Sequence, residues 1–143
     1  MTTVRKLLEE KNQSPIYTVK STDTVLDALK EMAKANTGSI LVSEGEKIVG
    51  IFTERDYARK LVLHGKSSKD TPISEIMTAN LFTIALNESI DHCMEMMSTY
   101  KIRHLPVIDN HRVTGMVSIG DVVKFIIEDQ KRTIQQLESY IAS

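Results

Sequence analysis

Apolar and polar positions along the chain follow one order of elements, and that order occurs twice. Each series opens with a short β-prone run, passes through a polar turn with helix-start residues, and reaches a segment with apolar residues at helical spacing. Two β-prone runs joined by a polar hairpin follow, and a closing helix completes the series. The pattern predicts two βαββα units.

The first series places its opening strand at Ile16–Val19 and its helix start at Thr22 or Asp23. The apolar face of its helix is expected at Val25, Leu29 and Met32. The second strand is expected at Ser39–Val42 and the hairpin at Glu44–Glu46, and the third strand is expected to end at Phe52. The closing helix is expected from Thr53. Each unit of about 50 residues is too small to bury a good core alone, so two units are expected to pack together.

The second series repeats this order with an opening strand at Leu81–Ile84 and a helix start at Asn87. The apolar face of its helix is expected at Ile90, Met94 and Met97. The second strand is expected at His104–Ile108 and the hairpin at Asp109–His111, and the third strand is expected to end at Val117. Its closing helix is expected from Ser118. We therefore expect an α+β (α/β-like) fold of two repeats related by pseudo-two-fold symmetry, with sheets packed together and helices outside.

A fixed offset supports the repeat. Gly50 and Gly115 lie 65 residues apart (115 − 50 = 65), and residues 14–61 align with 79–126 at this offset without a gap. Only five of the 48 aligned pairs are identical, so the argument depends on matched residue classes rather than on identity. The expected organisation is a first repeat at 4–64, a polar linker at 65–72, a second repeat at 73–128 and a helical extension at 129–143.

Composition narrows the function classes. The formal net charge is −1, so no strongly basic face is implied and nucleic-acid binding is not expected, although local basic spots are compatible with this charge. No apolar run approaches the roughly 20 residues that span a bilayer, so we expect no membrane association and a cytoplasmic location. The single cysteine, Cys93, fits a small buried helix residue better than a reactive thiol, because no partner residue for thiol chemistry lies nearby.

A hydroxyl residue followed three positions later by Asp occurs at the end of both repeats, as Thr53–Asp56 and Ser118–Asp121. One interpretation is structural, since such a pair caps a helix start. The other is functional, because a helix N-terminus attracts phosphate and an Asp one turn later can accept the hydrogen bonds of a ribose diol. Two copies at equivalent places favour the functional interpretation, since capping alone does not require Asp twice.

Both runs, Gly50-Ile51-Phe52-Thr53-Glu54-Arg55-Asp56 and Gly115-Met116-Val117-Ser118-Ile119-Gly120-Asp121, resemble the cystathionine-β-synthase (CBS) domain pair, or Bateman module. The resemblance extends to Ile102–Asp109 and Ile76–Thr78 and covers about residues 4–128. The chain is most similar to stand-alone bacterial pairs and their organellar plant relatives. The resemblance implies a regulatory module that binds AMP, ADP, ATP or NAD(H), or less favourably S-adenosylmethionine, in two clefts between the repeats.

The resemblance also assigns residues to the clefts. One cleft would combine Thr53 and Asp56 with the strand residues Leu81, Phe82 and Thr83. The other would combine Ser118 and Asp121 with the strand residues Ile16, Tyr17 and Thr18. Strand backbone groups would contact the adenine edge, and apolar side chains would cover its faces.

Basic residues for ligand phosphates are distributed unequally between the two repeats. Arg55, Arg103 and His104 are the candidates, and an Arg can hold phosphate through two parallel hydrogen bonds. Arg103 can equally be a solvated surface residue, and His104 a packed or capping one. The first repeat has Gly38-Ser39 where the second has Arg103-His104, so two unequal sites are expected, with Asp121 and Ser118 as the stronger one.

No obligatory cofactor, metal ligand set or catalytic residue is expected. The four histidines lack zinc-ligand spacing, and no nucleophile and base are paired. The resemblance implies a homodimer associated through helices, and an effector protein that receives the signal in trans. The alternative is a protein-interaction scaffold with vestigial nucleotide sites, in which the C-terminal helix contacts a partner.

Overall fold

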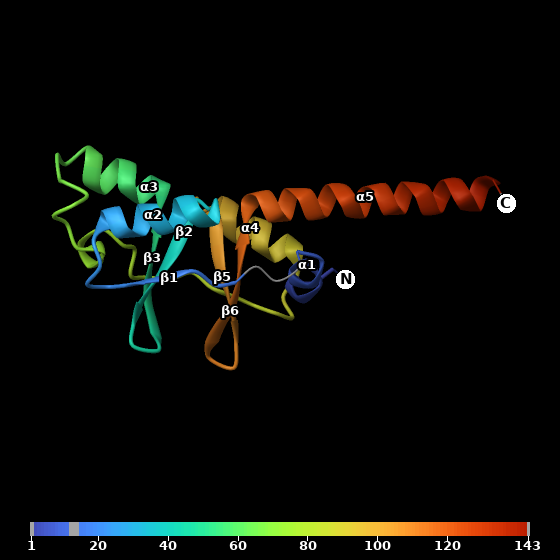
Figure 1. Ribbon diagram of the computed structural model, residues 1–143. Coiled ribbons are helices and arrows are strands. Elements are labelled where there is room, and N and C mark those ends of the chain that lie inside the picture. Colours follow the sequence, from blue (N-terminus) through green and yellow to red (C-terminus); the bar gives the residue numbers. More distant parts are fainter. Residues whose placement is uncertain (1, 12–14, 143) are drawn as a thin grey trace. The chain divides into compact units, whose positions relative to one another are not determined.

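The computed structural model describes residues 2–11 and 15–142 and contains two three-stranded sheets flanked by helices (Figure 1). The chain divides into two compact units. One unit is Pro15–Phe82, and the other joins Thr83–Ser143 to the N-terminal segment Met1–Ser14. Each unit contains one sheet, so the α+β class and the duplication predicted from the sequence are confirmed.

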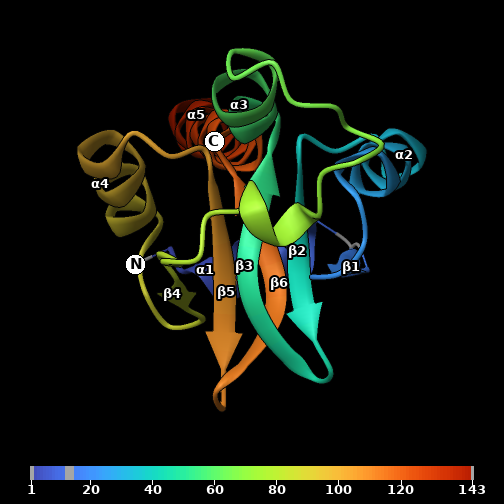
Figure 2. The same cartoon turned by 90° about the vertical axis from the view of Figure 1, so that its left-hand side faces the viewer.

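The unit Pro15–Phe82 is built on the sheet β1-β2-β3, in which β1 runs parallel to β2 and β2 antiparallel to β3. Its elements, in chain order, are β1 (Thr18–Lys20), α2 (Val25–Ala35), β2 (Ser39–Glu44), β3 (Lys47–Thr53), α3 (Glu54–Asp56), the π-helical segment η1 (Tyr57–Val62) and the 3-10 turn η2 (Ile73–Glu75). In Figure 2, α3 begins where β3 ends, so the hydroxyl-x-x-Asp motif lies at a strand-to-helix junction.

The other unit has the same order on the sheet β4-β5-β6. Its elements are α1 (Val4–Glu10), β4 (Ile84–Ala85), α4 (Ile90–Tyr100), β5 (His104–Asp109), β6 (Arg112–Ser118) and α5 (Ile119–Ala142). β4 runs parallel to β5, and β5 antiparallel to β6. Here the closing helix is a single helix of 24 residues that also includes residues 129–142 of the predicted C-terminal extension.

Strand register confirms the 65-residue offset at the level of single pairs. Val42 pairs with Gly50 in one hairpin, and Val107 pairs with Gly115 in the other. Both hairpins also shift register at the same place, directly after Val42 and after Val107. The two units are thus one sequence pattern folded twice, although few aligned residues are identical.

Each unit has its own buried core, formed where one face of the sheet meets the apolar faces of helices. In Pro15–Phe82 the core contains Val19, Val25, Ala28, Met32, Ile40, Val42, Phe52, Leu61, Ile73 and Ile76. In the other unit it contains Val4, Leu7, Leu8, Ile84, Ile90, Cys93, Met97, Leu105, Val107, Val117, Val122 and Phe125. Repeated apolar spacing therefore translates into two equivalent cores.

Two helices begin later than the sequence suggested. α2 is capped by Thr24 rather than by Thr22 or Asp23, because the Thr24 hydroxyl accepts from Asp27 N while the Asp27 carboxylate accepts from Thr24 N. Asp23 instead accepts from the backbone of Lys20 in the preceding turn. α4 is capped by Ser89 rather than by Asn87.

The apolar face of α4 also differs from the expectation. Met94 is 42% exposed, and the buried positions are Ile90, Cys93 and Met97. A step of three residues from Ile90 stays on the same helix face as well as a step of four, so spacing alone did not discriminate between Cys93 and Met94. The interpretation of Cys93 as a buried helix residue is confirmed.

The first helix packs with the second repeat. Val4 N donates to Glu88 O at 2.9 Å, and Arg5 N donates to Leu86 O at 2.9 Å. The segment after η2 pairs with β3, since Thr78 N donates to Ile51 O and Ile51 N to Thr78 O. Thus α1, which precedes β1, packs with the second repeat, and the segment that precedes β4 pairs with β3 of the first repeat. Neither segment forms a local hairpin with the strand that follows it.

Gly50 and Gly115 offer a matched test of how closely these segments pack. A Cβ at Gly50 would lie 2.6 Å from Met77 Sδ and 3.0 Å from Thr78 O, a backbone atom that cannot move alone. A Cβ at Gly115 would meet only the Leu8 side chain, at 3.0 Å. We expect Gly50→Ala to lower the free energy of unfolding by about 1–3 kcal/mol and Gly115→Ala by less, as measured by urea denaturation. Equal costs would contradict the assigned packing.

Candidate functional site

Both hydroxyl-x-x-Asp motifs cap the helix that follows them. Thr53 N donates to Asp56 Oδ2 at 3.0 Å, and Asp56 N donates to Thr53 Oγ1 at 3.2 Å. Ser118 N donates to Asp121 Oδ2 at 2.9 Å, and Asp121 N donates to Ser118 Oγ at 3.1 Å. These reciprocal bonds satisfy backbone donors at a helix start. The capping interpretation of both motifs is therefore confirmed, and it fixes the rotamer of each carboxylate.

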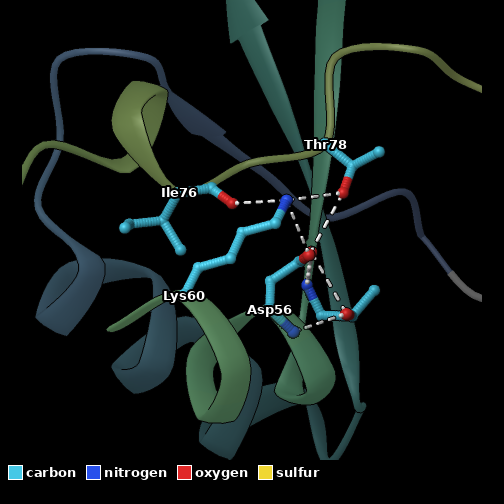
Figure 3. A network of polar contacts seen from close by, with 5 residues as sticks. Asp56, Lys60, Ile76 and Thr78 are labelled. Atoms are coloured by element: carbon cyan, nitrogen blue, oxygen red, sulfur yellow. Dashed lines mark hydrogen bonds and ion pairs between the residues drawn. The ribbon is translucent and has the colours of Figure 1, made fainter. Parts of the chain in front are cut away.

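The carboxylate of Asp56 is filled by partners from its own unit (Figure 3). Oδ2 accepts from the backbone N–H of Thr53 and from its hydroxyl, the latter at 3.1 Å. Oδ1 accepts from the Thr78 hydroxyl at 3.1 Å and pairs with Lys60 Nζ at 3.1 Å. A carboxylate offers about four acceptor positions, and three hydrogen bonds and the ion pair with Lys60 already surround that of Asp56.

Lys60 is equally committed to this network. Its ammonium contacts Asp56 Oδ1, donates to Ile76 O at 3.3 Å and donates to Thr78 Oγ1 at 3.1 Å. The contacts with Ile76 and Thr78 are hydrogen bonds, and the contact with Asp56 is an ion pair. The network joins α3 to the segment that follows η2, and its Asp56 side chain is only 10% exposed whereas Lys60 is 44% exposed.

The carboxylate of Asp121 has fewer partners. Oδ2 accepts from Ser118 N and pairs with Lys11 Nζ at 2.9 Å, while Lys11 also donates to Met116 O at 2.9 Å. The hydrogen bonds from Ser118 and Lys11 both reach Oδ2 and use two of the about four acceptor positions of the carboxylate of Asp121. Its side chain is 23% exposed, about twice the value of Asp56. Asp121 is thus the carboxylate with unused acceptor capacity.

Each Asp meets an ammonium group, but the two lysines are not equivalent in the repeat. Lys60 lies one turn after Asp56 on the same helical segment, whereas Lys11 is the C-cap residue of α1. The aligned counterpart of Lys60 is the buried Phe125, and that of Lys11 is Ile76. The two units therefore supply the same charge at the same carboxylate by different routes.

Arg103 and His104 lie beside the Ser118–Asp121 motif. Ile119 N donates to Arg103 O at 2.8 Å, and His104 pairs with Ser118 in the β5–β6 register. The first repeat makes the same backbone bond, from Glu54 N to Gly38 O at 3.1 Å. The predicted difference in basic residues is therefore located at the helix start itself, where one unit has Arg103-His104 and the other Gly38-Ser39.

The remaining predicted residues fall in different parts of the chain. Ile16, Tyr17 and Phe82 are exposed, and Leu81 and Thr83 are partly buried. Thr18 opens β1, and Arg55 lies in α3. Ile16, Tyr17 and Thr18 belong to one compact unit and Asp121 to the other, so the cleft that combines them stays a prediction.

Sequence reasoning missed Lys60, Thr78 and Lys11. A signal existed for Lys60, because residues four apart on a helix are neighbours and a carboxylate followed by an ammonium at this spacing forms a pair. Thr78 was noted only as part of the Ile76–Thr78 run. Nothing in the local pattern connects Lys11 with Asp121, which lies 110 residues later.

The thiol of Cys93 provides a test of the second core. Burial raises the pKa of Cys93 to about 11, and the Glu88 carboxylate adds to the shift. The thiolate is the reactive form, so raising the pKa from 9.0 lowers its population at neutral pH by about 100-fold. We expect a thiol reagent to modify the folded protein at least about 100-fold more slowly than the protein in urea; similar rates would contradict the burial of this residue.

No helix among the described residues is both long and apolar enough to cross a bilayer. Within the same residues, no group of three or more His, Cys, Asp or Glu side chains is arranged to hold a metal ion.

Comparison with known proteins gives relatives along most of the chain. The mitochondrial CBS domain-containing protein CBSX3 of Arabidopsis thaliana is 41% identical over 124 residues, which are 83% of this chain and 60% of that protein. The chain therefore spans less than two thirds of this relative. The CBS domain-containing protein YhcV of Bacillus subtilis is 32% identical over 107 residues, 75% of this chain and 76% of the relative.

Solved structures show the same fold. A putative signal-transduction protein with CBS domains from Burkholderia ambifaria is 47% identical, with a TM-score of 0.87 over 90% of this chain and 96% of that one. The CBS domain pair of protein MJ0100, solved in complex with 5′-methylthioadenosine and S-adenosyl-L-methionine, is 32% identical, with a TM-score of 0.77 over 90% and 98%. The family model described as CBS domain matches residues 4–63 and 73–128. The chain belongs to the CBS-domain family and carries two CBS repeats.

Proposed function

We propose that the chain is a regulatory module that binds an adenosine-containing ligand, with the ribose held by Asp121. The observation that carries this proposal is the unused acceptor capacity of the Asp121 carboxylate, which is fixed in place by Ser118 and Lys11. A ribose diol presents two adjacent O–H donors, and a carboxylate accepts both with charge-assisted hydrogen bonds. The adenosine ligands held by the related MJ0100 pair support this class of ligand.

The phosphate side of the ligand would meet the basic residues near the same helix start. Arg103 is exposed and joined through its carbonyl to the first turn of α5, and His104 is the strand neighbour of Ser118. Arg55 is the third candidate. Phosphates gain from both the cationic side chains and the N-terminal end of a long helix. This favours AMP, ADP, ATP or NAD(H), each with at least one phosphate, over S-adenosylmethionine, which has none.

The two sites are proposed to be unequal. The Ser118 and Asp121 site would be completed by Ile16 and Tyr17, which precede β1, and by Thr18, which opens it. The Thr53 and Asp56 site would use Leu81, Phe82 and Thr83, but a diol there must displace Thr78 or Lys60 from a filled carboxylate. We expect the Asp56 site to bind the ligand more weakly, or to serve only as a structural junction.

The role of the module would be to transmit occupancy to a partner without catalysis. A ligand shifts a conformational population only through different affinities for the two states, so the effector would be a protein that reads those states in trans. A homodimer is proposed as the working form. A cytoplasmic location also stays a prediction, since the Arabidopsis relative is described as mitochondrial.

The direct test is isothermal titration of the chain with AMP, ATP, NADH and S-adenosylmethionine, together with mass spectrometry of any small molecule that co-purifies. We expect a phosphate-containing adenosine ligand to bind with the highest affinity. The proposal fails if none of the four ligands binds at millimolar concentration.

A protein-interaction scaffold is the second candidate, and the filled carboxylate of Asp56 is the observation that favours it. A partner captured with the same affinity in the presence and absence of nucleotide, and equally by an Asp121→Ala variant, would support the scaffold. Partner binding that depends on nucleotide would support the sensor.

A further inference from the structure

The outer face of α5 carries a regular apolar row that the unit does not use. We call this row the α5 seam; its members are the apolar Val123, Ile127, Ile134, Leu137 and Ile141 and the one polar residue Gln130. They follow one another at steps of 4, 3, 4, 3 and 4 residues. This is the alternating spacing of positions d and a in a heptad repeat, which keeps one stripe of a helix facing a second helix over its whole length.

The unit packs against another face of α5. Val122 and Phe125 are buried in the core, and Arg132 pairs with Glu10 of α1 at 3.3 Å. The five apolar members of the seam are instead 47–81% exposed. A shallow groove of about 530 Å³ follows this exposed side between Ile119 and Lys131. The seam is thus distinct from the surface that holds α5 in its own unit.

The apolar side chains in the last part of α5 are exposed. Every residue from 133 to 142 is exposed, and in Figure 1 the helix extends past α4 and α1, the other helices of its unit. Helices in proteins owe most of their stability to the packing of an apolar face. A helical end that presents Ile134, Leu137 and Ile141 to solvent therefore indicates a partner outside the chain.

The residue types of the seam select the partner. We propose that α5 pairs with α5 of a second copy of the chain as a parallel, in-register, two-stranded coiled coil. Position a is Ile in three successive heptads, at Ile127, Ile134 and Ile141, while position d includes Leu137. β-branched residues at a with Leu at d favour parallel dimers over trimers and tetramers.

Gln130 fixes the direction of the pairing. In a parallel, in-register dimer it faces the partner's Gln130, and two side-chain amides can each donate to and accept from the other. In an antiparallel dimer with the same seam it would face the partner's Ile134, which leaves a buried amide without a hydrogen bond. A polar residue within an apolar seam specifies register in this way.

The charges beside the seam do not select a direction, which depends on Gln130. The flanking e positions are Lys124, Lys131 and Glu138, and the g positions Ile126, Thr133 and Tyr140 are uncharged. Parallel pairing therefore sets each of these charges against a neutral residue. Antiparallel pairing would place Lys131 against the partner's Lys131, where like charges repel, but also Lys124 against the partner's Glu138, where opposite charges attract. This inference names the surface of the proposed homodimer and does not depend on the adenosine site.

The test measures the mass of the full chain by light scattering and sedimentation velocity. The wild-type chain is expected at twice its 16.1 kDa. Ile134→Glu combined with Leu137→Glu should raise the dimer dissociation constant at least about 100-fold, because charges would enter the seam. The matched control, Gln136→Glu with Ser139→Glu, adds the same charge to the same turns away from the seam and should remain dimeric.

Direction is tested separately with Ile141→Cys. A parallel dimer places the two new thiols opposite each other, so mild oxidation should give a covalent dimer, whereas the native Cys93 is buried. A double-Glu variant that stays dimeric overturns the proposal, and absence of cross-linking in a dimeric Ile141→Cys chain overturns the parallel direction. Titration of adenosine ligands with the double-Glu variant keeps the two hypotheses apart, since binding should persist when the dimer is lost.

Discussion

Asp121→Asn is expected to weaken binding of the adenosine ligand by about 30- to 100-fold, because the carboxylate would lose its charge while the ribose diol keeps its two donors. Hydrogen bonds to a charged group contribute about 1.5–3 kcal/mol each, and about 1.4 kcal/mol corresponds to tenfold in affinity. The fold should persist, since the Asn oxygen can still accept from Ser118 N. Titration calorimetry measures the change.

A deoxy ligand makes this test specific to the diol. If Asp121 accepts from the ribose hydroxyls, the wild-type chain should bind AMP more tightly than 2′-deoxy-AMP, and Asp121→Asn should discriminate much less between them. Asp109→Asn is the matched control, because Asp109 carries the same charge at an exposed position of the same unit. Unchanged discrimination in Asp121→Asn would show that the diol binds elsewhere.

Asp56→Ala is expected to affect stability more than binding, lowering the free energy of unfolding by about 2–4 kcal/mol. Loss of a helix cap costs about 0.5–2 kcal/mol, and the Thr78 hydroxyl loses its charged acceptor. The ion pair with Lys60 adds little, because that side chain is 44% exposed and water screens the pair. Urea denaturation followed by circular dichroism measures the change.

The equivalent substitution gives the comparison. Asp121→Ala removes a helix cap and an ion pair with a lysine, but no hydrogen bond like the one from the Thr78 hydroxyl to Asp56. Its cost in free energy of unfolding should therefore be smaller than that of Asp56→Ala. Thr78→Val keeps the shape of the side chain and removes the hydroxyl, so it should lower the free energy of unfolding by part of the Asp56→Ala cost. In the Asp56→Ala background the same substitution should cause almost no further loss. Equal costs for the two aspartates would contradict the difference between the two networks.

The sequence was sufficient for features that depend on spacing. The period of apolar residues gave the two sheets and the helix faces, and the 65-residue offset gave paired hairpins whose registers agree at Gly50 and Gly115. Both Asp caps followed from a local motif in which the interacting groups are three residues apart. Local geometry of this kind is written into a short stretch of chain.

Features that depend on tertiary contacts could not be obtained in this way. The Lys11 pair with Asp121 joins residues 110 positions apart, and no periodicity connects them. The choice of Thr24 over Asp23 as a cap depends on Lys20, because its backbone N–H donates a hydrogen bond to the Asp23 carboxylate. Met94 and Cys93 were indistinguishable as core positions until the neighbours of α4 were known.

The placement of α1 has a consequence for the nascent chain. Its contact with the turn before α4, from Val4 to Glu88, closes a loop of more than 80 residues, whereas Pro15–Phe82 is one continuous stretch. During synthesis α1 emerges first, and its contacts with the second repeat can form only after that repeat has left the ribosome. Until then Val4, Leu7 and Leu8 remain uncovered, which makes this short helix a natural binding segment for chaperones that recognise apolar residues in unfinished proteins.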